Sequence, residues 1–122
     1  MSCYFNVSGT DVWNPSNSVA ELYVGQVHGI AGLFGGESGV GDIVDDECAI
    51  TLGEFAGFTE ELCRRYLGSN NPALRSLEKG AVLISVALLE RAGGHGGQES
   101  VSTVWEQHRD ELLCLLGSMP EG

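Results

Sequence analysis

NPALRSLEKGAVLISVALLERA, residues 71–92, is the stretch that decides the fold. Asn71 suits the position just before a helix, and Pro72 suits the first turn, where its missing N–H costs nothing. The apolar side chains then recur at alternating steps of three and four, which indicates one buried helical face. They are Leu74, Leu77, Ala81, Ile84 and Leu88, with Val82, Val86 and Leu89 widening the face. We therefore expect a central core helix from 72 to about 92.

Three more helices are predicted around this one. The first begins after Asn14-Pro15 or at Ser18, which has capping-box spacing, and ends at Gly35-Gly36. Its expected apolar face is Val19, Leu22, Tyr23, Val27, Ile30, Ala31 and Phe34. The second follows Thr51, ends near Gly68, and buries Phe55, Phe58, Leu62 and Tyr66. The last runs from about 101 to 116 and buries Trp105, Leu112, Leu113, Leu115 and Leu116.

The β structure is expected at the N-terminal end. Residues 3–7 and 10–13 flank Ser8-Gly9 and predict a short hairpin, and residues 47–50 have the composition of one more short strand. Residues 35–47 are expected to form a Gly-rich acidic loop, and residues 93–99 a flexible Gly-rich break. The sequence thus predicts a single α+β domain over 1–122. It is mainly α, with a short N-terminal β-hairpin packed on about four helices.

Charge is distributed very unevenly along the chain. The first 63 residues hold ten Asp and Glu but no Lys or Arg, and all six basic residues lie in the second half, beside seven acids. The formal net charge is −11. Such a surface repels phosphate backbones and anionic lipid headgroups, whereas it attracts basic faces of other proteins. We expect no nucleic-acid and no membrane partner.

No apolar run reaches the roughly 18–20 residues of a membrane span. Residues 1–6 have neither a basic region nor a long apolar region, so they do not resemble a signal peptide. The four cysteines, at positions 3, 48, 63 and 114, are widely spaced and form no CxxC motif. We therefore expect a cytoplasmic protein with free, buried thiols and no cofactor.

The densest charge in the sequence is the run Asp42, Asp45, Asp46 and Glu47. These residues lack the alternate spacing and the turn glycine of a calcium loop, so no metal site is predicted. Gly36 and Gly41 match the glycines of a phosphate-binding loop, but Asp42 and Ile43 replace its Lys and its Ser or Thr. A carboxylate at that position would repel a nucleotide. We predict instead that the four acids bind a basic protein partner, as in an immunity-type inhibitor or small adaptor.

Two alternatives stay open. A small enzyme or metal-assisted catalyst could use Cys48 or Cys63 with one of the histidines, His28, His95 and His108, because such partners meet only in space. No catalytic residue is assigned, because no flanking sequence marks a nucleophile. Gly25, Gly29 and Gly32 predict close packing of the first helix, within the chain or across a homodimer.

Several short stretches resemble a family of small actinobacterial proteins of unknown function. The more specific are Trp13-Asn14-Pro15-Ser16-Asn17 and Asp46-Glu47-Cys48. The others lie at residues 1–7, 38–41, 64–67, 72–75 and 88–93. The resemblance covers residues 1 to about 93. It implies a bacterial cytosolic origin, but it assigns no activity, cofactor or site residue.

Overall fold

Two hairpins build the β structure of the protein. The structure is a computed structural model that describes residues 2–93 and 98–119. Strands β1 (Tyr4–Val7) and β2 (Thr10–Trp13) form the predicted hairpin, and strands β3 (Val40–Val44) and β4 (Glu47–Ile50) form a second one. Both have two-residue turns in which each φ is positive, at 52° and 84° in the first turn and 52° and 61° in the second. This turn geometry matches the right-handed twist of the paired strands.

The two hairpins join into one mixed sheet with the strand order β2-β1-β4-β3. Strand β4 lies parallel to β1, with Cys48 opposite Phe5, and the other two pairs are antiparallel. Each outer strand has a carbonyl that accepts a hydrogen bond from a basic side chain on a helix. Arg91 Nε donates to the Val12 oxygen at 2.5 Å, and His28 Nε2 donates to the Val40 oxygen at 2.8 Å.

The helices begin and end where local chemistry dictates. Helix α1 (Asn17–Phe34) starts after Ser16, whose side chain accepts from the Val19 N–H, and helix α2 (Leu52–Gly68) starts after Thr51. Helix α3 (Pro72–Ala92) has the predicted bounds, and the Asn71 side chain accepts from the N–H groups of Ala73 and Leu74. Helices α4 (Glu99–Gln107) and α5 (Arg109–Ser118) complete the chain.

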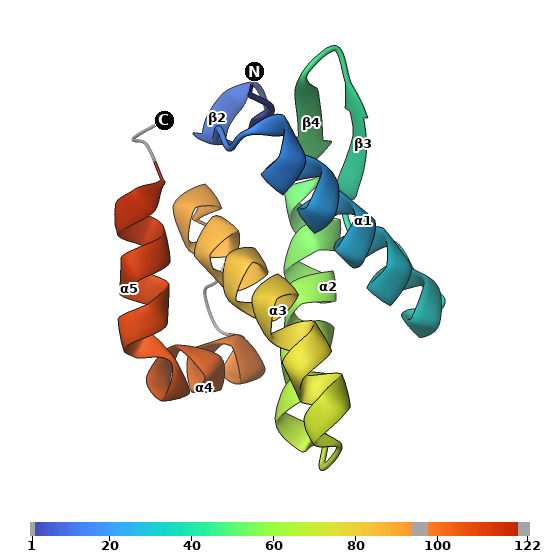
Figure 1. Cartoon of the computed structure of the whole chain (residues 1–122), viewed down its shortest axis with the longest axis vertical. Helices are drawn as coiled ribbons and strands as arrows, with labels where there is room; N and C mark the ends of the chain where they lie inside the picture. The colour runs from blue at the N-terminus through green and yellow to red at the C-terminus, as the bar shows by residue number, and fades with distance from the viewer. Residues whose placement is uncertain (1, 94–97, 120–122) are drawn as a thin grey trace.

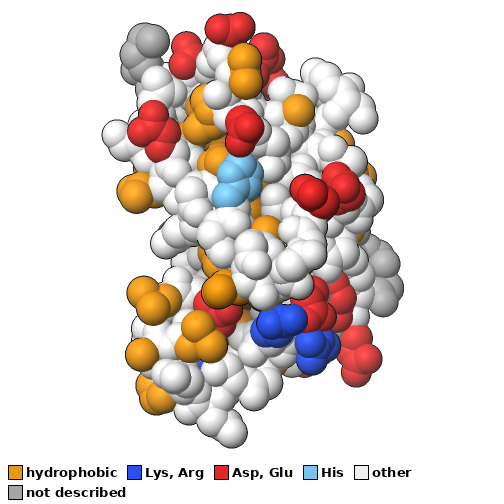
Figure 2. Space-filling model, turned by 90° about the vertical axis from the view of Figure 1, so that its right-hand side faces the viewer, with side chains coloured by type: hydrophobic (Ala, Val, Ile, Leu, Met, Phe, Trp, Pro, Cys, Tyr) orange, Lys and Arg blue, Asp and Glu red, His pale blue; other side chains and the backbone are white. Residues whose placement is uncertain are grey.

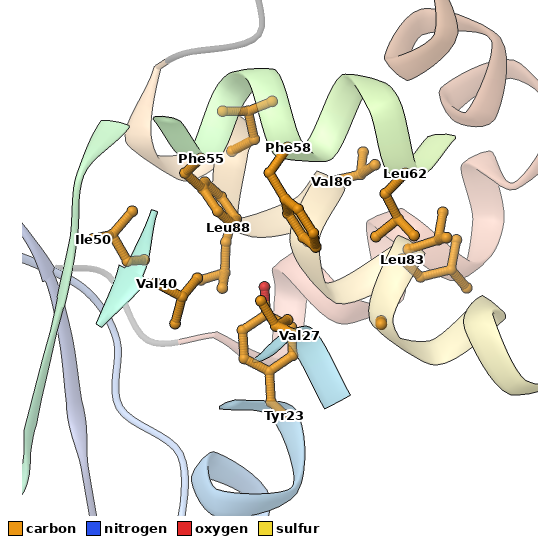
Figure 3. Close-up of a cluster of buried hydrophobic side chains, with 14 of the residues drawn as sticks. Tyr23, Val27, Val40, Ile50, Phe55, Phe58, Leu62, Leu83, Val86 and Leu88 are labelled. Carbon is orange, nitrogen blue, oxygen red and sulfur yellow. The ribbon is translucent and has the colours of Figure 1, made fainter. Parts of the chain in front are cut away.

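Helix α3 is the central element, as its apolar pattern predicts. It packs against α2 and α5, while α1 lies across α3 and beside β3 (Figure 1). Side chains from α1, α2, α3 and the second hairpin meet in one apolar cluster (Figure 3). The Tyr23 hydroxyl, buried in this core, lies 2.7 Å from the Ser85 hydroxyl. The fold is therefore α+β and mainly α, as predicted.

Two predicted elements were wrong. The expected loop over 35–47 contains strand β3, so it forms half of a hairpin. The last helix was predicted as one, but the structure has two helices there, α4 and α5. They meet at His108, where φ is −125°. His108 Nε2 lies 3.3 Å from the Tyr66 hydroxyl, which fixes the corner against α2. Of the expected break at 93–99, Gly93 is the left-handed cap of α3, and residues 94–97 lie outside the described residues.

Several side chains expected in the core are exposed instead. They are Val19, Leu22, Leu74, Leu77 and Leu113. The prediction that Gly25, Gly29 and Gly32 pack closely within the chain is also wrong, because a Cβ at any of them would meet no atom within 4 Å. Each glycine costs a helix about 1 kcal/mol relative to Ala. No contact within the described structure offsets that cost.

No helix among the described residues combines the length and the apolar composition of a membrane span.

Candidate functional site

The structure places all four predicted acids on the second hairpin. We call residues 40–50, strands β3 and β4 with their turn, the acidic hairpin. Asp45 and Asp46 form its turn, Glu47 follows directly, and Asp42 lies on β3 with a side chain that is 86% exposed. All four are exposed, and the hairpin stands at one end of the molecule beside the N-terminal strands (Figure 1). Acidic side chains gather at the upper end of the face seen in Figure 2.

The base of the acidic hairpin is anchored in the protein. Val40, Cys48 and Ile50 are buried in the core. At the start of β3 the Thr51 N–H donates to the Gly39 oxygen at 2.7 Å. Gly39 has φ +81°, and a Cβ there would lie 2.4 Å from the Phe55 nitrogen, so only glycine fits this contact. The carboxylates are therefore presented on a framework held by both the core and helix α2.

His28 ties the hairpin to helix α1. Its Nε2 donates to the Val40 oxygen, and its Nδ1 lies 3.8 Å from Asp42 Oδ1, which makes an ion pair when the imidazole is protonated. These residues line a polar hollow of about 440 Å³ that also includes Glu37 and Ser38. The sequence had not linked His28 to the acids, because twelve residues separate it from Val40 and no local motif joins them.

Two exposed apolar side chains lie close to the acids. Tyr4 pairs with Glu47 in the parallel register, and its N–H donates to the Asp46 oxygen at 2.9 Å. Tyr4 is 43% exposed, and Val44, just before the turn, is 65% exposed. Sequence reasoning missed both, since only the long-range β1–β4 pairing brings Tyr4 here. The surface therefore combines an aromatic ring and an aliphatic group with exposed carboxylates.

A family model matches residues 1–121. The chain belongs to DUF6086, a family of unknown function. This confirms the resemblance to a family of unknown function, while the actinobacterial origin stays a prediction. No curated protein and no solved structure matches the chain.

Three of the four cysteines of this DUF6086 protein are buried, as predicted, whereas Cys114 is exposed. Burial, followed by the charges of Cys3 and Asp42, raises the pKa of Cys48 to about 12, and the Cys48 thiol donates to the Gly41 oxygen at 3.4 Å. Burial and then Glu60 raise the pKa of Cys63 to about 12. A catalytic cysteine needs an accessible thiolate at neutral pH, whereas both of these thiols are fully buried and stay protonated.

The two histidines among the described residues contact groups other than the cysteine thiols. His28 contacts Val40 and Asp42, while His108 contacts Tyr66 and Glu111. His95 lies outside the described residues. Across residues 2–93 and 98–119, no group of three or more His, Cys, Asp or Glu could hold a metal ion. The acidic hairpin is therefore the strongest candidate site in the described structure.

Proposed function

We propose that this DUF6086 protein is a non-enzymatic interaction module that docks a basic protein through the acidic hairpin. The observation that carries the proposal is the placement of four exposed carboxylates on one anchored hairpin. The half of the chain that holds them has no Lys or Arg up to residue 63, so these charges are not neutralised by basic neighbours in sequence. A small adaptor or an immunity-type inhibitor would bind its basic partner through such an acidic surface.

The arrangement supports both attraction and specificity. The negative field at this end of the molecule accelerates encounter with a basic surface, an effect that salt weakens. Tyr4 and Val44 supply apolar area next to the acids, and aromatic side chains provide much of the energy of protein interfaces. Because core contacts and Gly39 already fix the hairpin, little conformational entropy is lost when a partner binds.

The experiment is capture of partners from the native lysate with matched charge variants. The hairpin variant combines Asp42→Lys and Glu47→Lys with Asp45→Asn and Asp46→Asn, since Asn tolerates the positive φ of the turn. The control variant, Asp11→Lys with Glu54→Lys and Glu106→Lys, changes exposed acids elsewhere and raises the net charge equally. A captured protein is then purified, and its affinity for each form is measured by calorimetry at increasing salt.

The proposal predicts a basic protein that binds the wild type and the control variant but not the hairpin variant. Higher salt should weaken that binding. Equal loss in both variants would reduce the effect to overall charge, and no loss in the hairpin variant would refute the docking site. Circular dichroism of each variant verifies the fold.

A further inference from the structure

The end of helix α1 packs against helix α2 beside the start of helix α3. The Phe34 and Phe58 rings lie 5.6 Å apart, and the Arg65 guanidinium lies 4.3 Å from the centroid of the Phe34 ring. A pocket of about 330 Å³ remains between the three helices. Two leucines and two arginines are among the residues that line it: Leu33, Leu74, Arg64 and Arg65. The pocket thus combines apolar walls with a basic side.

A buried carboxyl group also lines this pocket. Glu78, on α3, is only 6% exposed, and its Oε1 is fully buried without a hydrogen-bond partner. Burial disfavours the ionised form of a carboxyl group, because the charge loses its hydration. Burial therefore raises the pKa of Glu78, and the charge of Arg65 opposes this effect. The packing thus favours the uncharged state of a group that can titrate.

The basic residues on either side of Glu78 along α3 are engaged elsewhere. The Lys79 ammonium lies 3.2 Å from Glu111 Oε1, on helix α5. The Arg75 guanidinium lies over the Tyr66 ring, 4.6 Å from its centroid. The last turn of α1 contains no basic residue. A charge on Glu78 must therefore be compensated from α2.

Arg65, on α2, has donors left for this purpose. Its Nε donates to Glu61 at 2.6 Å, and within the described structure its terminal Nη groups make no hydrogen bond. A guanidinium carries five N–H donors, so it can bind two carboxylates at once. The acid that follows α1, Glu37, does not compete for these donors, because it lines the hollow of His28 instead.

We propose that Glu78 is a pH-dependent latch between helices α1, α2 and α3. In its uncharged form Glu78 stays buried, and the end of α1 is closed over the pocket. In its ionised form the side chain turns within the pocket toward the Nη groups of Arg65. The packing of Leu33 and Leu74 beside it then loosens. The moving part is the end of α1, and the carboxyl group is the sensor.

The sign of the effect follows from the raised pKa. The stabilisation by uncharged Glu78 is fully present below the ordinary carboxyl pKa of about 4.3. It is lost as the pH rises through the raised pKa of the folded state. The latch does not involve the acidic hairpin, so it does not depend on the proposed function. Either proposal can fail without the other.

Hydrogen exchange at about pH 5 and about pH 8 tests the latch, after correction for the intrinsic pH dependence of exchange. In the wild type, the protection of amides 30–34 and 74–78 should fall several-fold more between these pH values than protection in strand β1. Glu78→Gln keeps the shape but cannot ionise, so it should retain high protection at both. Glu54→Gln, which removes an exposed carboxylate from α2, is the control and should behave as the wild type.

Arg65→Gln tests the partner of the ionised form. Without this cation the loss of protection should have its midpoint at higher pH, because the ionised carboxylate is less stabilised. The lost stacking on Phe34 lowers protection at every pH but does not move the midpoint. Arg64→Gln, the matched variant, should shift the midpoint less. Absence of the pH effect in the wild type, its persistence in Glu78→Gln, or equal shifts in the two arginine variants would overturn the proposal.

Discussion

His28 and Val40 join helix α1 to the outer strand of the sheet through a hydrogen bond of 2.8 Å from the imidazole Nε2 to the carbonyl oxygen. Apart from this contact, strand β3 pairs with β4 alone among the described strands. The bond therefore adds to the core contacts and the Gly39 contact that hold the hairpin carrying Asp42, Asp45, Asp46 and Glu47. An imidazole on helix α1 thus helps to hold the strand that carries Asp42.

Replacing His28 should loosen the acidic hairpin without unfolding the protein. We expect His28→Ala to lower the free energy of unfolding by about 1 kcal/mol, the usual net value of one hydrogen bond. Urea denaturation measures the loss, and hydrogen exchange should show faster amide exchange in β3 than in β1. His28→Gln, which keeps an N–H donor, should recover part of both effects. Unchanged exchange in β3 would contradict the role of this contact.

The Tyr23 and Ser85 hydroxyls should behave as a coupled pair. Tyr23→Phe keeps the ring that contacts Phe5 and Trp13 but leaves the buried Ser85 hydroxyl without its partner. We expect a loss of about 1–3 kcal/mol in the free energy of unfolding. Adding Ser85→Ala should then cost less than it does in the wild type, because no orphaned hydroxyl remains. Strictly additive losses in this double-mutant cycle would show that the hydroxyls do not interact.

Cysteine reactivity should follow burial. Cys114 is exposed, whereas Cys3, Cys48 and Cys63 are buried and their pKa values are raised. In native buffer an alkylating agent should modify Cys114 first, and the other three should react only in denaturant. Mass spectrometry of timed samples gives the order. Rapid modification of Cys48 or Cys63 in the native protein would instead support the hypothesis of a catalytic cysteine.

The ion pairs of Glu61 should make stability depend on pH. Hydrogen bonds from Arg64 and then Arg65 lower the pKa of Glu61 to about 2. Because the folded-state pKa is depressed, the contribution is present above the ordinary carboxyl value of about 4.3 and is lost as the pH falls toward 2. Its size should be at most about 1 kcal/mol, since the pair is partly exposed.

Thermal unfolding of the wild type and Glu61→Gln across this range measures the effect. The variant should melt at a lower temperature at about pH 6, and the two curves should converge near about pH 2. Glu54→Gln, which removes an exposed acid in the first turn of the same helix, serves as the comparison for a lost charge. A difference between wild type and Glu61→Gln that does not change with pH would contradict this ion-pair account.

The helices were largely predictable from local chemistry. Asn71-Pro72 and the three-and-four spacing located α3, and Gly35 located the end of α1, because caps and apolar periodicity are encoded within a few residues. The break at His108 was not predictable in this way. It depends on a contact with Tyr66, forty-two residues earlier.

The acidic hairpin was only half predicted. The four acids were identified as one surface, and residues 47–50 as a strand, but the glycines around 35–41 suggested a loop. Two signals could have revealed β3: the apolar pair Ile43-Val44 on one side of Asp45-Asp46, and residues 47–50 on the other. Asp tolerates the left-handed conformation that such a turn needs. The positions of Tyr4 and His28 beside it result from tertiary contacts, which no local pattern encodes.

The glycines of α1 show that the sequence of one helix does not determine what packs against it. Their pattern predicted close packing within the chain or across a homodimer, but it could not distinguish the two. The open space above Gly25, Gly29 and Gly32 excludes the first for the described structure.

The most direct test of the central claim is the salt-dependent affinity of a captured basic partner for the wild type, the hairpin variant and the control variant of equal charge. The account predicts that changing Asp42, Asp45, Asp46 and Glu47 abolishes binding, while changing Asp11, Glu54 and Glu106 leaves it nearly intact at moderate salt. An affinity that depends only on net charge, with both variants equally weakened, would contradict a docking site on the acidic hairpin.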